Sequence, residues 1–311
     1  QDIGPGTVFE FDSAGKAIDS VVYARGEFYK TYFGIEPRVG LLFSINPKSS
    51  AKASYSRTIQ YLQLAQNTTV GTPLDIWFPA SPNVEPQTCD QVALGYFRNF
   101  RRNTIETSVE GYYKYMNHVI DFKDHAILLM NNKLEGEILE GTGYSYGIEC
   151  LVRLNETRLN GWVSYTYSRS FRVIPGINDG NPYPAPYDKP NSLNIVASYQ
   201  IAKRWSVSAN WVYATGNPVT FPTGRAVIGG KVIPIYSDRN AYRYEDYHRL
   251  DLSVDFSSKQ KPGAKFTWDL NFSVYNVYNR HNTWTINFVQ DNEDPNVTYA
   301  EKVYLFGIIP S

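Results

Sequence analysis

Two successive segments of strictly alternating apolar and polar side chains constrain the fold of this chain more than any other feature of its sequence. The apolar positions of the first segment are Leu193, Ile195, Ala197, Tyr199 and Ile201, and those of the second are Trp205, Val207, Ala209, Trp211 and Tyr213. A period of two is that of a β-strand with one apolar and one polar face. Only Ala202-Lys203-Arg204 lies between the segments. We therefore predict a β-hairpin with an apolar and a polar face.

The same alternation recurs along most of the chain. It predicts about eleven strands, because apolar and polar parities separate repeatedly between turn-rich stretches. The predicted strands are 34–45, 51–62, 91–100, 104–117, 142–154, 159–169, 191–201, 205–213, 248–256, 266–278 and a last one within 302–311. Residues 1–25 are polar and rich in Gly and Asp, which favours a loop with a small hairpin.

The connections between these strands alternate between short and long. The short ones are 46–50, 101–103, 155–157, 202–204 and 257–265, and the long ones are 63–90, 119–140, 171–189, 215–247 and 279–300. Transmembrane β-barrels sort their loops in this way, with strands of ~10 residues, short periplasmic turns and long extracellular loops. The predicted fold class is therefore all-β, an antiparallel up-and-down transmembrane β-barrel, located in the outer membrane of a Gram-negative bacterium.

Composition agrees with an all-β protein and argues against nucleic-acid binding. Tyr, Phe and Trp make up 15% of the 311 residues, while 30 basic and 30 acidic side chains leave no net charge to attract nucleic acid. The predicted polar face carries charges that would be costly in a dry core but suit a water-filled lumen. The charged residues predicted to face the lumen are Glu106, Glu110, Lys114, Glu149, Arg153, Arg249, Asp251 and Asp255. Because these residues carry charges of both signs, we favour a structural role, as pairs of opposite charge across neighbouring strands, over a path for a substrate.

Candidate chemical groups are sparse. His248 lies near Asp246 and Asp251, and His125 lies near Asp121 and Asp124, but no spacing matches a zinc or calcium loop. No nucleophile elbow or phosphate loop is present, so we expect neither catalysis nor a cofactor nor a metal site. Cys89 in a predicted loop and Cys150 on an apolar strand face form no disulfide framework.

Aromatic residues are frequent in the predicted loops. Nine of them are candidates for contacting a sugar, a peptide or a hydrophobic ligand: Trp77, Phe78, Tyr183, Tyr187, Phe221, Tyr236, Tyr242, Tyr244 and Trp284. The alternative, which we favour, is that these rings pack the long loops against each other.

Several stretches resemble the C-terminal barrel portion of TonB-dependent outer-membrane receptors of the Bacteroidetes type. They are YDKPNSLNIVASYQIAKRWSVSANWVYATGNPVTFPTGR, YHRLDLSV, NFSVYNVYNRHN, KVYLFGIIPS and, upstream, FPASPNVEPQTCDQVALGYFRN and IDFKDH. The resemblance implies a barrel of about 22 strands with an N-terminal plug inside it. It also implies import of a scarce nutrient such as a siderophore, glycan or peptide, with the TonB complex, outer-membrane lipid and a surface lipoprotein as partners.

This sequence departs from the family pattern in its lack of a plug, its strand count and its ending at Pro310-Ser311. We therefore expect residues 1–311 to form a single partial barrel domain, without the plug and the final strand, that is part of a receptor. Two alternatives stay open: a complete passive channel of about twelve strands, and a soluble β-rich binding protein. Detergent dependence would separate the last from the others, because a chain that stays monomeric in plain buffer has no lipid-facing band.

Overall fold

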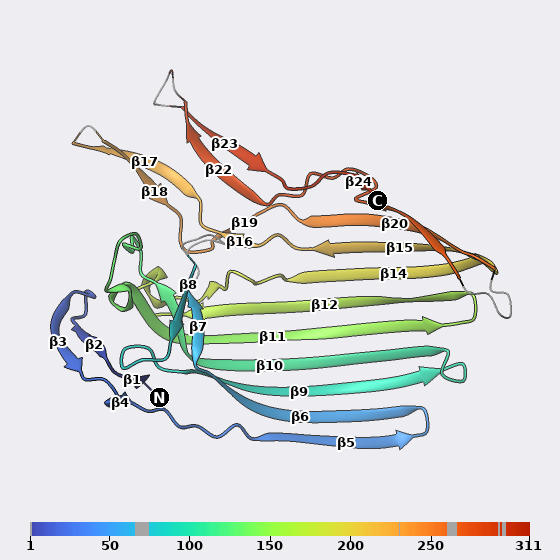
Figure 1. Ribbon diagram of the computed structural model, residues 1–311, viewed down its shortest axis with the longest axis horizontal. Helices are drawn as coiled ribbons and strands as arrows, with labels where there is room; N and C mark the ends of the chain where they lie inside the picture. The colour runs from blue at the N-terminus through green and yellow to red at the C-terminus, as the bar shows by residue number, and fades with distance from the viewer. Residues whose placement is uncertain (1, 66–74, 230, 260–265, 292, 294–296) are drawn as a thin grey trace.

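A single antiparallel sheet dominates the computed structural model of the chain (Figure 1). The structure describes residues 2–65, 75–229, 231–259, 266–291, 293 and 297–311. The sheet has 12 strands, and eleven of them follow one path in the order β24-β21-β20-β15-β14-β12-β11-β10-β9-β6-β5, with β13 pairing beside β12. Consecutive strands along this path are also successive main strands of the chain, which is the up-and-down order predicted from the sequence.

The main strands cover nearly every segment that alternates in the sequence. They are β5 (Arg38–Asn46), β6 (Ser49–Gln60), β9 (Gln87–Phe100), β10 (Ile105–Phe122), β11 (Ile138–Asn155), β12 (Leu159–Val173), β13 (Tyr183–Pro184), β14 (Asn191–Ala202), β15 (Trp205–Ala214), β20 (Tyr247–Ser257), β21 (Asp269–Tyr275) and β24 (Ile309–Pro310). The all-β antiparallel prediction is confirmed. No α-helix occurs among the residues that the structure describes, and hence none long and apolar enough to cross a membrane.

Short strands outside the main sheet form small ladders in the N-terminal segment and the long connections. They are β1 (Asp2–Ile3) with β4 (Phe28–Lys30), β2 (Gly6–Phe11) with β3 (Ala17–Tyr23), β7 (Leu62–Ala65) with β8 (Ile76–Pro79), β16 (Pro218–Val219) with β19 (Tyr242–Arg243), β17 (Pro222–Ile228) with β18 (Lys231–Tyr236), and β22 (Thr285–Gln290) with β23 (Thr298–Val303). The hairpin expected within residues 1–25 is thus confirmed. The long connections contain more regular structure than their composition predicts.

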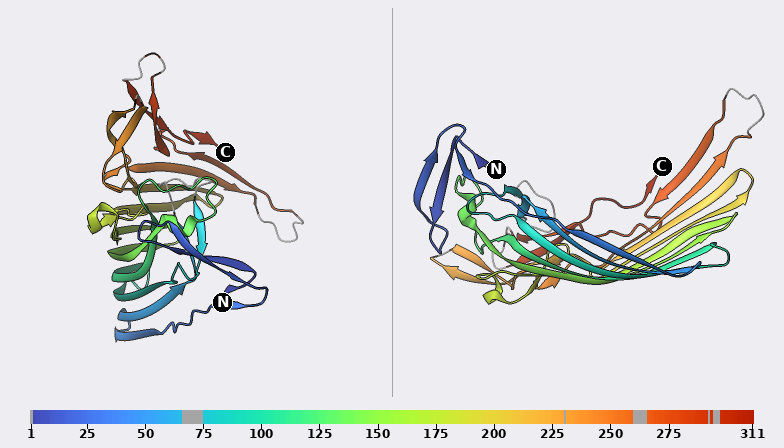
Figure 2. Two further views of the ribbon diagram at one scale, coloured as in Figure 1. Left: turned by 90° about the vertical axis from the view of Figure 1, so that its left-hand side faces the viewer. Right: turned by 90° about the horizontal axis from the view of Figure 1, so that it is seen from below.

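All short connections lie at one end of the sheet and the long ones at the other (Figure 1). We call these the turn end and the loop end. The turn between β14 and β15 consists of Lys203 and Arg204, one residue shorter than predicted. Much of the predicted turn 257–265 lies outside the described residues. The sheet curves into an open trough (Figure 2), and its outermost strands β5 and β24 do not pair with each other.

Register assigns the faces of the sheet. Residues directly opposite each other on paired strands share a face, and Leu193 is opposite Tyr213, Ile195 is opposite Trp211, and Tyr199 is opposite Val207. The predicted apolar face of this hairpin is therefore confirmed. The same face continues across the sheet through Phe43, Tyr96, Val109, Cys150 and Tyr165.

The apolar side chains of this face are exposed. Leu41, Leu94 and Phe272 have 68%, 70% and 64% of their surface accessible. The buried hydrophobic residues lie instead toward the loop end. One cluster joins Ala65, Phe78, Val84, Ile120 and Phe122, and a second joins Ile174, Ile177 and Tyr183. The strands therefore have no covered apolar side, as expected for a wall whose solvent on that side is lipid.

Several local predictions differ from the structure. Cys89 lies in β9 rather than in a loop, and both cysteines are free. The predicted strand 266–278 is limited to β21, because Asn276 adopts φ 55° and turns the chain. The last strand predicted within 302–311 is the short β24, which joins the main sheet, whereas residues up to Val303 pair locally with β22.

Candidate functional site

A buried carboxylate at the loop end gathers three segments that are far apart in the sequence. Asp121, at the end of β10, is only 2% exposed. It accepts hydrogen bonds from Arg172 Nη1 at 3.1 Å, Arg239 Nη1 at 3.2 Å and the Tyr183 hydroxyl at 2.8 Å. Charge-assisted contacts of this kind are among the stronger hydrogen bonds in proteins. Asp121 thus joins β12, the β12–β14 connection and the β15–β20 connection.

Arg239 fixes the position of the β15–β20 connection. Its Nη2 donates to Asp124 Oδ1 at 2.7 Å and to the Phe122 carbonyl at 3.1 Å. Its backbone N–H donates to Asn178 Oδ1 at 2.8 Å. Burial acts against the charged guanidinium, but Asp121 and Asp124 outweigh it and raise the pKa of Arg239. The side chain is therefore a permanent cation that ties its loop to the end of β10.

Tyr183 completes this cluster as a neutral donor. Its ring is 1% exposed and its hydroxyl points at the Asp121 carboxylate. Burial, followed by the negative charge of Asp121, raises the pKa of Tyr183 well above its usual range. The phenol therefore stays protonated and donates its hydrogen bond to Asp121 at any physiological pH.

A second buried carboxylate, Asp188, follows five residues after Tyr183 and connects the same loops. Asp188 is 1% exposed and accepts the backbone N–H of Ser170 at 2.6 Å and Arg169 Nε at 3.4 Å. Arg243 forms an ion pair with its carboxylate and also donates to the Asp188 carbonyl at 2.7 Å and to the Gly216 carbonyl at 3.1 Å. We call Asp121, Arg172, Tyr183, Arg239, Asp188 and Arg243 the loop clamp.

Sequence reasoning did not identify the loop clamp. In the sequence, Asp121 and Asp124 stand out only as metal-ligand residue types near His125. In the structure, both carboxylates accept hydrogen bonds from Arg239. In the other candidate group, the side chain of His248 contacts the Tyr278 hydroxyl at 2.8 Å rather than Asp246 or Asp251. Within the described part of the chain, no group of three or more His, Cys, Asp or Glu side chains is placed to hold a metal ion.

The nine loop aromatics fall into two sets. Phe78 and Tyr183 are 4% and 1% exposed and belong to the buried clusters, so they are not available to a ligand in this structure. The other seven are at least partly accessible: Trp77, Tyr187, Phe221, Tyr236, Tyr242, Tyr244 and Trp284.

Phe221 is the centre of an aromatic group at the loop end. Its ring centroid is 5.8 Å from that of Tyr242, 6.0 Å from that of Tyr244 and 5.3 Å from that of Phe288. These are usual distances for stacked and edge-to-face pairs. Packing of the loops against each other, the alternative favoured from the sequence, thus accounts for part of the set. Tyr242 nevertheless keeps 47% of its surface exposed.

The eight charged residues predicted to face the lumen share one face of the sheet. Glu106 is opposite Arg153, and Glu110 is opposite Glu149. Lys114 shares the even parity of Glu106 and Glu110 in β10. Asp251 lies in one row with Arg153 through Asn210, Val196 and Trp162. Arg249 and Asp255 share the parity of Asp251. Two ion pairs form among these eight residues, Arg153 with Glu106 at 3.4 Å and Arg249 with Asp251 at 2.9 Å.

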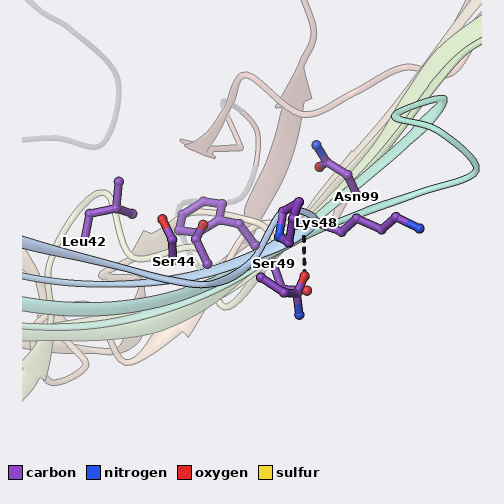
Figure 3. A pocket seen from close by; sticks show the side chains of 9 residues that line it. Leu42, Ser44, Lys48, Ser49 and Asn99 are labelled. Carbon is purple, nitrogen blue, oxygen red and sulfur yellow. Dashed lines mark hydrogen bonds between the residues drawn. The ribbon is translucent and has the colours of Figure 1, made fainter.

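A shallow hollow of about 780 Å³ lies on this charged face at the turn end (Figure 3). Leu42, Ser44, Lys48, Ser49 and Asn99 contribute to its lining, and the backbone N–H of Lys48 donates to Asn46 Oδ1 at 2.9 Å. The hollow is open, and its lining mixes serine and asparagine side chains with Leu42, Pro47 and Phe97. It lacks the enclosed, convergent arrangement of a small-molecule site.

Solved structures with the same fold are outer-membrane receptors. The ferric-catecholate import receptor Fiu from Escherichia coli K12 matches with a TM-score of 0.55 at 16% identity over 85% of this chain and 34% of that chain. The ferripyoverdine receptor of Pseudomonas aeruginosa matches with a TM-score of 0.55 at 14% identity over 86% and 31%. The siderophore receptor PiuA from Acinetobacter baumannii matches with a TM-score of 0.53 at 15% identity over 87% and 34%.

This chain therefore spans about a third of the length of these structures. No curated protein sequence matches it. The family model described as TonB dependent receptor-like, beta-barrel, matches residues 9–277, which include the main strands from β5 to β21 and the loop clamp. The chain belongs to the TonB-dependent receptor beta-barrel family, whose members are proteins of the Gram-negative outer membrane.

Proposed function

We propose that this chain forms part of the barrel wall and the loop cap of a receptor that imports a nutrient across the outer membrane with energy from the TonB complex. The observation that carries the proposal is the match of the family's barrel model over residues 9–277. The up-and-down sheet, with its exposed apolar face and its charged opposite face, supports it. The charged face, including Glu110 and Asp251, then borders the lumen.

The same proposal includes the rest of the barrel and the partners. An open sheet leaves unpaired backbone groups on β5, which a bilayer does not tolerate, so residues 1–311 act as a partial barrel domain beside further strands of the receptor. A plug domain would contact TonB, and a surface lipoprotein would cover the loop end. The stretch from Tyr187 to Arg225 supports a receptor of the Bacteroidetes type.

Ligand capture is assigned to the exposed aromatics of the loop end. The loop clamp holds the β15–β20 connection in place, and this connection carries Tyr236, Tyr242 and Tyr244. Flat rings held on a fixed loop suit a siderophore, a glycan or a peptide with apolar surfaces. Preorganisation matters here, because a loop that is already ordered loses less conformational entropy when it binds.

Uptake of a labelled nutrient by cells that express the whole receptor tests the proposal. We expect uptake to stop when TonB is deleted, whereas a passive channel would continue to admit the nutrient. Tyr242→Ala should weaken binding about 2- to 10-fold, the usual value of one aromatic contact. Tyr199→Ala, on the apolar face near the turn end, is the matched control and should leave affinity unchanged.

A further inference from the structure

Every short connection of the main sheet carries a basic side chain. The five turns contain, in chain order, Lys48, Arg101, Arg158, Arg204 and Lys259, and all five of these residues are exposed. Arg102 and Lys203 add a second base to two of the turns. The five turns lie along one edge of the sheet (Figure 1), and we call their Lys and Arg residues the basic rim.

The two ends of the sheet differ in the sign of their charge. Among the described residues, the turns 47–48, 101–104, 156–158, 203–204, 258–259 and 266–268 contain seven Lys and Arg against one acid, Glu156. The described residues of the long connections (61–65, 75–86, 123–137, 174–190, 215–229, 231–246, 276–291, 293 and 297–308) contain nine Lys and Arg against thirteen Asp and Glu. The chain as a whole has no net charge, but its positive charge is concentrated at the turn end. This difference between the two ends requires a physical explanation.

Aromatic rings lie directly beside the basic rim on the apolar face. The Trp205 and Phe256 centroids are 4.6 Å apart, and those of Phe256 and Trp268 are 5.4 Å apart. Arg204 extends over Phe256 with its guanidinium carbon 5.1 Å from the ring centroid. Aromatic rings of this kind mark the boundary between the hydrocarbon core and the headgroups.

Arg98 repeats this arrangement on another strand. It shares the parity of Tyr96 in β9, so it lies on the apolar face, and its guanidinium carbon is 4.8 Å from the centroid of the Phe100 ring toward the turn. A long basic side chain on a lipid-facing surface keeps its stem in the apolar layer and directs its charge to the headgroups. The Arg98 cation therefore lies toward the turn end of the apolar face.

We propose that the basic rim, with the adjoining rings of Trp205, Phe256 and Trp268, binds the headgroups of anionic glycerophospholipids in the leaflet that borders the short turns. The phosphates of that leaflet complement the exposed Lys and Arg side chains, and the rings fix their height relative to the bilayer. The rim thereby orients the barrel and sets its depth. This role is independent of which nutrient the receptor takes up.

Native mass spectrometry of the whole receptor in detergent, titrated with phosphatidylglycerol or with phosphatidylcholine, tests the proposal. Each Lys or Arg near a headgroup contributes about a fivefold preference for anionic lipid. Lys203→Gln with Arg204→Gln should therefore lower the preference for phosphatidylglycerol roughly 25-fold. Lys16→Gln with Lys189→Gln removes two exposed cations on the loop side of the sheet and is the matched control.

Three outcomes decide the matter. Loss of preference in the turn variant alone supports the proposal, and Lys203→Arg with Arg204→Lys should then retain it, which shows that charge rather than a damaged turn is responsible. An unchanged preference in the turn variant overturns the proposal and leaves the rim to an acidic protein partner. An equal loss in the control variant also overturns it, because the effect would then follow total charge rather than position.

Discussion

Removing the Asp121 carboxylate should be the most damaging single truncation at the loop end. Asp121→Ala leaves Arg172, which is 6% exposed, and Arg239 without their shared buried counter-charge. Deleting one partner of a buried ion pair costs about 3–5 kcal/mol, because the remaining charge stays desolvated. We expect a loss of this size in the free energy of unfolding of the receptor in lipid vesicles, measured by tryptophan fluorescence in guanidinium chloride.

Asp124→Ala provides the matched control for this prediction. Asp124 binds the same Arg239 at 2.7 Å, but its side chain is 58% exposed. An exposed ion pair contributes about 0–1 kcal/mol, so this variant should remain close to the wild type. Hydrogen exchange should show faster exchange in residues 174–190 and 215–246 for Asp121→Ala alone. If the two variants lose equal stability, burial of the clamp is not what gives it strength, and the reasoning fails.

Three further predictions concern the same loops. Gly216→Ala should destabilise the β15–β20 connection by about 1–3 kcal/mol, since the new Cβ would lie 1.9 Å from the Tyr244 carbonyl oxygen; Gly224→Ala, whose Cβ meets nothing nearer than 3.9 Å, should fold as well as the wild type in the same unfolding measurement. Tyr183→Phe removes a hydrogen bond to a charged acceptor and should cost about 1.5–3 kcal/mol at neutral pH. The raised pKa of Tyr183 also sets a pH dependence: the unfolded chain releases this proton first, so stability should fall as pH rises above the usual tyrosine range, and a wild type that loses no more stability there than Tyr183→Phe would contradict this.

The hairpin 191–214 shows why so much of this fold could be predicted from the sequence. Each strand faces two different solvents, and the side chains must alternate to match them. The prediction failed where this requirement ends. In β10 the alternation continues to Asn117 and is then broken by a bulge, where His118 adopts φ 59°. The strand goes on to Phe122 beyond the bulge, in register with β11, and no local pattern marks this extension.

The loop clamp could not be predicted for a different reason. Asp121 and Arg239 are separated by 118 positions, and each is an ordinary polar residue in its own segment. Their pairing depends on how the β12–β14 and β15–β20 connections fold over the end of β10. The geometry of such loops follows no periodic pattern that can be recognised in a sequence. The sequence did place Tyr183 in the connection between β12 and β14, where the structure has the two-residue strand β13. It could not show that the ring is buried against Asp121.

The loop end and the strand faces nearer the turns are stabilised in different ways, as the location of the buried residues indicates. The buried hydrophobic side chains, such as Phe78, Ile120 and Ile174, lie toward the loop end, and so do the clamp carboxylates Asp121 and Asp188. The strand faces nearer the turns depend on lipid and on the lumen for their surroundings. Loop-end substitutions should therefore change folding through lost packing and unpaired charge, whereas substitutions on the strand faces should act mainly through contacts with lipid. A loop end with its own core can hold binding residues in place while the wall beneath it adapts to the bilayer.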